Sequence, residues 1–338
     1  MALPDNPIMF ANNPLDRAGH LRPNPDWVAA QLASEVALIV PLWQLNPLVL
    51  PELQPGDGRD VGYLPKAAFG EAWSDTMQVV FLGLNRRQKP LFAADISHMS
   101  APEDMGPFKG MGQFEDLRGL AAAGDISRTE LAILAQAKGM LDWNLRTPFC
   151  AQCGHASQSA EGGYKRRCDT CGTEHFPRTD PVVIMLATHG EDCLMGRQRG
   201  WPEGMLSALA GFMEPGETLE EAVARELMEE AGIEVSSVSY LGSQPWPFPG
   251  SLMIGCMAKA SHRDIQVDEV GGCARTCAGI EFVSTNGTVV QCRYDGAGFS
   301  GANRTTVITI NDQNSNTARF QYDYDRGEMT GIPSGDQR

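Results

Sequence analysis

Residues 211–233 contain the stretch GFMEPGETLEEAVARELMEEAGI, and this stretch decides the fold around it. Its second half, at 218–231, predicts a helix that ends at Gly232. Three carboxylates share one face of that helix because they stand at i, i+3 and i+4, namely Glu226, Glu229 and Glu230. The apolar face that we expect to pack on a sheet consists of Leu219, Ala222, Val223 and Leu227.

The crowding of these carboxylates indicates a bound cation. Three anions on one face repel one another, and a hard divalent ion such as Mg²⁺ or Mn²⁺ offsets that repulsion through oxygen ligands. We expect Arg225 to pair with the carboxylates, Glu217 among them, and Gly211 and Gly216 to permit a tight loop before the helix. Metal-held water next to such a loop favours attack on a phosphoanhydride, with one carboxylate accepting the proton. The alternative is a solvated acidic helix.

Short apolar segments on both sides of the helix predict strands. PVVIMLAT at 181–188 and CLMGRQ at 193–198 precede it, while IEVSSVSYLGSQ at 233–244 and SLMIGCMAKAS at 251–261 follow it. Strands around one strongly marked helix predict a fold that mixes helices and strands, in the broad α/β class and more closely the α+β class.

The segment SQPWPFPGS at 243–251 joins the last two predicted strands. Its three prolines alternate with Trp246 and Phe248, which favours a stiff, extended loop. Such a loop can stack on a planar base with little loss of entropy. The alternative is a proline-aromatic loop that packs in the core.

Four of the nine cysteines form two Cys-x2-Cys pairs, Cys150 with Cys153 and Cys168 with Cys171. Each pair presents two thiolates to one metal, and the intervening segment allows the second pair to complete a tetrahedron. We therefore expect one Zn²⁺ with a structural role, since four thiolates leave no open coordination position. Free buried cysteines are the alternative.

The region before the cysteines predicts a mixed α/β domain of strands broken by turns. ISRTELAILAQAKGMLDWN at 126–144 predicts a helix with Ser127 and Glu130 as a capping box. We divide the chain into five parts. They are an N-terminal mixed α/β domain (1–125), a linker helix (126–147), a zinc ribbon (148–176), a catalytic domain (177–270) and a polar tail (271–338).

The composition of the tail differs from the rest of the chain. Its 68 residues contain no Leu, Trp, Lys or His, and no window has the apolar stripe that a closing helix needs. VITI at 307–310 predicts a short strand at best.

Charge and composition exclude several classes of protein. With 27 basic and 42 acidic residues, the formal net charge is −15, which argues against nucleic-acid binding through a broad basic surface. A hydrophobic content of 42% argues against whole-chain disorder. No apolar stretch predicts a membrane span and no export signal is visible in residues 1–20, so we expect a cytoplasmic protein of two or three domains.

The stretch at 211–233 resembles the Nudix box, Gly-x5-Glu-x7-Arg-Glu-apolar-x-Glu-Glu-x-Gly-apolar. With the cysteine pairs, HFPRTDPVVIML at 175–186 and SQPWPFPGSLM at 243–253, it resembles the NADH pyrophosphatase branch of the Nudix hydrolases. The resemblance implies a Nudix α/β/α sandwich after a zinc ribbon. It also implies hydrolysis of the pyrophosphate bond of NADH or NAD⁺ to nicotinamide mononucleotide and AMP, and NAD-cap removal from RNA by some members.

The resemblance further implies roles for single residues. Glu226, Glu229, Glu230 and the backbone carbonyl of Ala210 would bind Mg²⁺ or Mn²⁺, with Glu229 as ligand or base. Phe212 would stack on a base, Phe176 would reach the other site of a homodimer, and Arg118 matches a substrate-binding arginine. The expected substrate-binding loop consists of Ser243, Gln244, Pro245, Trp246, Pro247, Phe248, Pro249 and Gly250.

Two other functions remain open on the sequence. The tail departs from the family pattern, and Gly271 and Gly272 stand about where a further metal-binding glutamate is expected. This departure favours a catalytically weakened Nudix and zinc-ribbon protein that acts as a binding module. The other function is hydrolysis of other nucleoside diphosphate derivatives such as ADP-ribose, against which the SQPWPFPGS segment argues.

Overall fold

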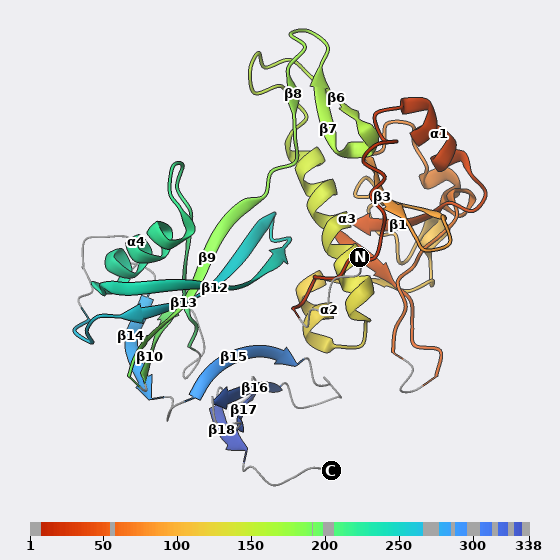
Figure 1. Ribbon diagram of the computed structural model, residues 1–338. Coiled ribbons are helices and arrows are strands. Elements are labelled where there is room, and N and C mark those ends of the chain that lie inside the picture. Colours follow the sequence, from red (N-terminus) through yellow and green to blue (C-terminus); the bar gives the residue numbers. More distant parts are fainter. Residues whose placement is uncertain are drawn as a thin grey trace. The chain divides into compact units, whose positions relative to one another are not determined.

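The structure is a computed structural model that describes residues 8–54, 58–190, 192–198 and 206–265 and five strands beyond residue 276. The chain divides into two compact units (Figure 1). The N-terminal unit comprises Met1–Thr179 and Pro245–Gly250, and the C-terminal unit comprises Asp180–Gln244 and Ser251–Arg338. No helix in the described ranges is long and apolar enough to span a membrane.

A five-stranded sheet with the order β3-β4-β1-β2-β5 forms the centre of the N-terminal unit. Strand β1 pairs in parallel with β4, and the other pairs are antiparallel. The strands are β1 (Leu38–Trp43), β2 (Asn46–Val49), β3 (Val79–Leu84), β4 (Pro90–Asp95) and β5 (Gln113–Phe114).

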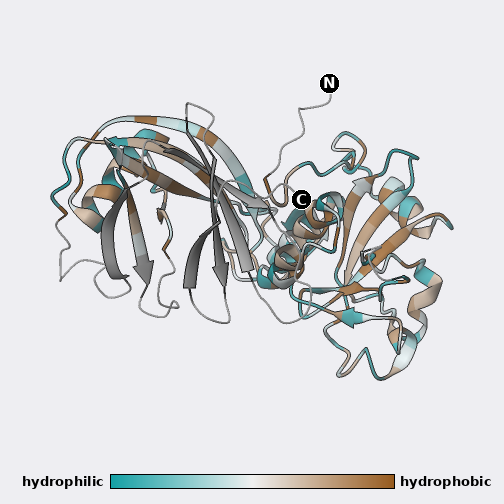
Figure 2. Cartoon of the chain, turned by 90° about the horizontal axis from the view of Figure 1, so that it is seen from below, coloured by the Kyte–Doolittle hydropathy of each residue, from teal (hydrophilic) through white to brown (hydrophobic). Residues whose placement is uncertain are grey.

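These strands are apolar almost throughout because the sheet is buried on both faces. Alternate side chains point to opposite faces of a strand. Val40 and Leu42 therefore join the core formed with helix α3, whereas Ile39 and Phe92 join a second core that is rich in aromatic side chains. Figure 2 shows the hydrophobic colouring of this sheet.

The predicted linker helix is present as α3 (Arg128–Arg146). The Ser127 hydroxyl caps it by accepting a hydrogen bond from the Glu130 N–H at 3.2 Å. The expected reciprocal half of the capping box is absent, because the Glu130 carboxylate accepts instead from the Tyr63 hydroxyl. Further helical elements of this unit, which no sequence pattern predicted, are α1 (Pro25–Ala33), α2 (Leu117–Ala123), η1 (Lys66–Ala72) and η2 (Gly106–Phe108).

The cysteine module follows α3 as a small three-stranded antiparallel sheet. It consists of β6 (Ser157–Ala160), η3 (Glu161–Gly163), β7 (Lys165–Cys168) and β8 (Glu174–His175). The guanidinium of Arg166 on β7 donates to Asn144 near the end of α3, so the ribbon is attached to the helix by hydrogen bonds as well as by the chain.

The C-terminal unit contains a sheet with the order β12-β13-β9-β10-β14, and β11 pairs with β9. β9 is parallel to β13 and antiparallel to β10 and β11. All four strands predicted around the helix are present in β9 (Asp180–His189), β10 (Asp192–Gln198), β12 (Val235–Trp246) and β13 (Ser251–Ala260), and β11 (Leu209–Phe212) is an additional strand.

Helix α4 (Leu219–Ala231) packs on this sheet through the predicted apolar face. Ala222, Val223 and Leu227 are fully buried against Val183 and Met185 of β9. Among the described residues of the C-terminal unit, α4 is the one helix. The sandwich predicted from the family resemblance therefore has one helical layer in the described part of the chain.

The described parts of the tail are strands, and their number exceeds the prediction. VITI lies within β16 (Thr305–Asp312), which forms a sheet with β15 (Thr288–Asp295), β17 (Thr317–Asp323) and β18 (Glu328–Ile332). A further strand, β14 (Cys277–Ser284), pairs antiparallel with β10 in the sheet of the C-terminal unit. The strand at VITI is longer than expected, and further strands accompany it, because alternating Thr, Val and Ile residues favour extended pairing even without Leu. Gly271 and Gly272 lie outside the described residues.

Candidate metal centre and active site

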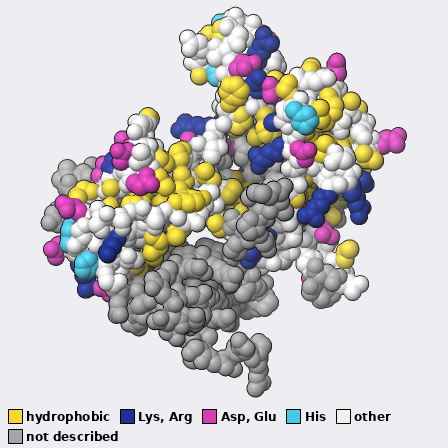
Figure 3. Space-filling model, in the orientation of Figure 1, with side chains coloured by type: hydrophobic (Ala, Val, Ile, Leu, Met, Phe, Trp, Pro, Cys, Tyr) yellow, Lys and Arg dark blue, Asp and Glu magenta, His cyan; other side chains and the backbone are white. Residues whose placement is uncertain are grey.

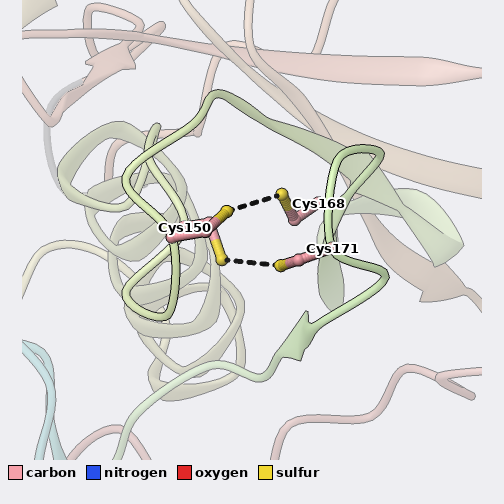
Figure 4. Close-up of side chains that lie close together, drawn as sticks. Cys150, Cys168 and Cys171 are labelled. Carbon is pink, nitrogen blue, oxygen red and sulfur yellow. Dashed lines mark hydrogen bonds between the residues drawn. The ribbon is translucent and has the colours of Figure 1, made fainter.

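The four cysteines predicted to bind zinc converge from two facing turns (Figure 4). Their sulfur atoms all lie within 4.8 Å of one another. Cys150 and Cys171 sulfurs are 3.6 Å apart, and those of Cys153 and Cys168 are 3.5 Å apart. Zn–S bonds of 2.3 Å in a tetrahedron place sulfurs about 3.8 Å apart, so the cluster fits a zinc ion.

The surroundings of this cluster also suit thiolate ligands. The His175 Nε2 lies 3.2 Å from the Cys150 sulfur, and the Thr173 hydroxyl lies 3.1 Å from the Cys171 sulfur. Gly154 and Gly172 follow the second cysteine of each pair and adopt positive φ angles of 76° and 75°, which glycine accommodates without strain. Because all four ligands come from the chain, the ion would stabilise the ribbon and leave no position for a substrate.

Helix α4 fixes the acidic side chains of the Nudix box. A reciprocal capping box of Thr218 and Glu221 begins the helix, and Gly232 ends it in the left-handed conformation. Glu226 is largely buried with 12% of its side chain exposed, whereas Glu229 is 59% exposed. Thus the same helix face presents one enclosed and one solvent-accessible carboxylate.

Arg225 connects the helix to the loop and strand before it. Its guanidinium donates to Glu217 through Nη2 at 3.0 Å, to Glu226 and Glu229 through Nη1 at 2.9 and 3.1 Å, and to the Phe212 carbonyl at 2.9 Å. The predicted pairing of Arg225 with Glu217 is therefore confirmed. One guanidinium holds the loop, strand β11 and two of the glutamates in a fixed arrangement.

Gly211 has a different role from the one predicted. It lies in β11 without a positive φ angle, and a Cβ atom there would lie 1.8 Å from Cδ of Glu226. A side chain at this position would have to displace the Glu226 carboxylate, which packs directly against the backbone here. The turn before the helix depends instead on Gly216, whose φ is 98°.

The pKa values of two carboxyls in this cluster reflect its geometry. Donation by Arg225, followed by the backbone N–H of Glu214, lowers the pKa of Glu217 to about 2. Burial, followed by the negative charges of Glu226 and Glu229, raises the pKa of Glu230 to about 7. A carboxyl that resists ionisation next to two other acidic groups marks a place where a cation would stabilise the ionised form.

A divalent cation fits the donor set of α4, but the glutamates are not drawn tightly together. Among the described residues, the cysteines form the one group of at least three acidic, His or Cys side chains whose donor atoms all lie within 4.8 Å. Arg225 occupies part of the coordination capacity of Glu226 and Glu229. Glu226, Glu229 and Glu230 supply the oxygen ligands that Mg²⁺ and Mn²⁺ prefer.

The remaining residues predicted in the C-terminal unit lie on its strands. Ala210 and Phe212 are in β11 beside Glu226, and the Phe212 ring is 61% exposed, as a stacking surface requires. Ser243 and Gln244 are in β12 rather than in a loop. Figure 3 shows acidic and hydrophobic side chains together over the described part of this unit.

The aromatic part of the SQPWPFPGS segment packs within the N-terminal unit. β12 extends to Trp246, and a tight turn follows over Pro247, Phe248, Pro249 and Gly250. Trp246 and Phe248 each make an edge contact with Phe10 at 6.1 Å, and both join the core around α3. The segment therefore follows the packed alternative more closely than the free extended loop.

Arg118 and Phe176, the last two predicted substrate residues, also belong to the N-terminal unit. The Arg118 guanidinium lies 4.3 Å from the centre of the Phe248 ring and 5.5 Å from that of Trp246, so the structure brings it to the predicted loop. Phe176 follows β8 and is 61% exposed, with Lys165 5.5 Å from its ring centre. The Lys138 Nζ lies 5.8 Å from the centre of the Phe248 ring. No sequence pattern predicted that this residue of the linker helix would lie near the segment.

Three protein-domain families match consecutive parts of the chain. The NADH pyrophosphatase-like rudimentary NUDIX domain matches residues 36–143, the NADH pyrophosphatase zinc ribbon domain matches 145–176, and the NUDIX domain matches 176–263. The chain therefore belongs to the Nudix hydrolase family. Its zinc ribbon and rudimentary N-terminal domain assign it to the NADH pyrophosphatase branch.

The chain is similar in sequence to several curated relatives. The chain is 34% identical over 297 residues to the human NAD-capped RNA hydrolase NUDT12, and 37% identical over 210 residues to the mouse mitochondrial NAD(P)H pyrophosphatase NUDT13. It is 47% identical over 141 residues to the NAD-capped RNA hydrolase NudC of Mycobacterium bovis. These matches cover 77%, 59% and 41% of this chain and 63%, 59% and 44% of the relatives. The chain thus spans less than two thirds of the relatives' length.

Proposed function

We propose that this chain hydrolyses the pyrophosphate bond of NADH or NAD⁺ to nicotinamide mononucleotide and AMP. The observation that carries the proposal is the arrangement of the Nudix-box glutamates. Arg225 donates hydrogen bonds to Glu226 and Glu229, and Glu226 packs on Gly211. The names of the relatives support the same chemistry.

Different residues of the chain have separate roles in this reaction. Arg225 and Gly211 fix Glu226 as an enclosed ligand group, and the Ala210 carbonyl and Glu230 complete the oxygen set. Bound Mg²⁺ or Mn²⁺ supplies charge neutralisation and a water of lowered pKa. Glu229 has access to solvent and can accept a proton at its carboxylate oxygen. The exposed Phe212 ring provides a stacking surface for one base.

A hydrolysis assay with NADH and Mg²⁺ or Mn²⁺ tests the proposal. Glu230→Gln should abolish turnover because it removes a ligand charge at constant shape, and Glu220→Gln on the exposed side of α4 is the matched control. Retention of more than about a tenth of the activity, a loss under about 1.4 kcal/mol of barrier, would remove Glu230 from the key ligands. Nucleotide binding without hydrolysis in the unmodified chain would favour the binding-module alternative. Faster hydrolysis of ADP-ribose than of NADH would favour the other alternative.

We further propose that the chain acts on NAD-capped RNA, forms a homodimer and functions in the cytoplasm. The names of two relatives support the RNA substrate, and the family resemblance supports the dimer. The same proposal includes the five-part division of the chain. It also includes the substrate roles of Arg118, Phe176, Phe212 and residues 243–250. Light scattering of the purified chain tests the dimer, and release of NAD-derived mononucleotide from capped RNA tests the substrate.

A further inference from the structure

A groove of about 440 Å³ lies in the N-terminal unit, between residues of the central sheet, the end of α3 and the zinc ribbon. Its polar lining comes from four places in the sequence: the loop before β3, the end of β4 with the loop after it, the end of α3 and the ribbon strand β7. The residues that matter are Ser74, Thr76, Asp95, His98 and Arg166. None of them belongs to the Nudix box or to the SQPWPFPGS segment.

Arg166 is a buried cation whose hydrogen-bond partners are all neutral. Its side chain is 7% exposed, and its guanidinium donates to the Ser157 hydroxyl and carbonyl at 2.9 and 2.6 Å and to the Asn144 side chain at 3.3 Å. Both nearby ribbon glutamates pair instead with Lys165, Glu161 at 2.6 Å and Glu174 at 3.2 Å. Within the described ranges no carboxylate forms an ion pair with Arg166.

A buried charge without an opposite charge is costly, and proteins compensate it with a partner or a bound ion. Burial also lowers the pKa of Arg166, which shows the same desolvation. Arg166 is part of the lining of an open groove, so an anion that enters the groove can supply the missing charge. Phosphate and carboxylate oxygens both match a planar guanidinium, and a phosphate monoester carries the larger negative charge.

The rest of the lining fits the other end of a phosphorylated ligand. Asp95 uses Oδ1 to accept from Ser97, and its other oxygen has no hydrogen-bond partner among the described residues. A carboxylate of this kind accepts from ribose hydroxyls. Met77, Leu145 and Pro148 add apolar surface, and the volume falls in the usual range of small-molecule sites.

We propose that this groove binds a phosphate monoester that carries hydroxyl donors, with a nucleoside 5′-monophosphate as its representative. Arg166 binds the phosphate and Asp95 binds the hydroxyl groups. Because every residue involved belongs to the N-terminal unit, the site does not depend on the hydrolytic assignment of the Nudix box.

Calorimetric titration of the zinc-loaded full chain with AMP, without added divalent metal, tests the proposal. Asp95→Asn and Arg166→Lys should each weaken AMP binding at least tenfold, whereas Asp26→Asn, the same change at an exposed carboxyl on α1 of this unit, should leave the binding unchanged. Adenosine and inorganic phosphate, which each offer half of the ligand, should bind more weakly than AMP.

Two outcomes would overturn the proposal. One is an AMP affinity that is unchanged by Asp95→Asn, which would leave Arg166 as a structural link between ribbon and helix. The other is AMP binding that disappears in Phe212→Ala alone, which would assign the ligand to the Nudix box. Asp95 is only partly buried, so its variant keeps the test valid if Arg166→Lys fails to fold.

Discussion

The zinc ribbon and helix α4 both collect metal ligands, but they do so in different ways. In the ribbon, four sulfurs from two short turns already lie within 4.8 Å of one another, and local sequence spacing is enough to bring them together. On α4, three glutamates share a face, yet Glu226 and Glu229 are held by Arg225, and Glu226 packs on the bare backbone of Gly211 in strand β11. A structural site can be encoded locally, whereas this candidate catalytic site needs tertiary contacts.

The largest expected effect belongs to the locally encoded site. Cys168→Ser should release zinc and unfold the ribbon, because structural zinc contributes on the order of 10 kcal/mol to folding of small ribbons. Elemental analysis and urea unfolding measure both consequences. Cys256→Ser removes an equally buried thiol outside the cluster and should retain one zinc per chain. Equal zinc content in the two variants would show that the cluster is not a metal site.

The second effect tests whether the glutamates depend on their supporting strand. Gly211→Ala places a methyl group where the Glu226 carboxylate lies, so we expect NADH hydrolysis to fall at least about 30-fold, or about 2 kcal/mol of barrier. Gly255→Ala in β13 is the matched control, since the closest atom to its Cβ would be the Gly242 carbonyl oxygen at 3.4 Å. If both variants kept full activity, Glu226 would not need this contact.

The third effect sharpens the role of Arg225. Lysine keeps the charge but loses the planar fork, so Arg225→Lys should loosen the loop from α4 and lower activity about tenfold. The pKa of Glu217 should rise from about 2 toward its usual value near 4.5, which NMR titration measures. Arg263→Lys, which alters the ion pair with Asp192 in the same unit, should leave Glu217 unchanged. An unshifted Glu217 in Arg225→Lys would contradict the assigned cause.

The same contrast explains what the sequence could predict. The cysteine cluster, the limits of α4 and the four strands around it follow from spacing and periodicity, which are local properties. The contact of Gly211 with Glu226 joins different elements, and glycine alone does not reveal whether a turn or a neighbour requires it. Trp246 and Phe248 were ambiguous for a similar reason, because their partners Phe10 and Arg118 are distant in sequence.

The N-terminal unit was predicted only in outline. Its strands are apolar on both faces, so they lack the alternation that distinguishes one face from the other. The sequence could not predict the groove that Arg166 lines, because the lining comes from separate segments between residues 74 and 166. The described parts of the tail are strands, which the lack of Leu did not argue against.

The smallest expected effect concerns the two helix caps, which repeat the contrast between local and tertiary control. Thr218 and Glu221 form a reciprocal box on α4, whereas Glu130 at the start of α3 bonds to Tyr63 instead. Burial is the main cause that raises the pKa of Glu130 above 4.5, although the Tyr63 hydroxyl opposes the shift. The folded state therefore binds this proton more tightly than the unfolded state. Stability should fall as pH rises from about 4.5 through the raised pKa.

Glu130→Gln should make this decline with pH shallower, because an amide keeps an acceptor for Tyr63 but has no proton to lose. Urea unfolding of the full chain between pH 4.5 and 7.5, followed by a signal from the N-terminal unit, measures the slope. Glu35→Gln changes an exposed carboxyl of the same unit and should retain the slope of the unmodified chain. An identical slope in Glu130→Gln would show that burial of this carboxyl does not couple folding to protonation. The missing half of the cap would then reflect only the preference of Glu130 for Tyr63.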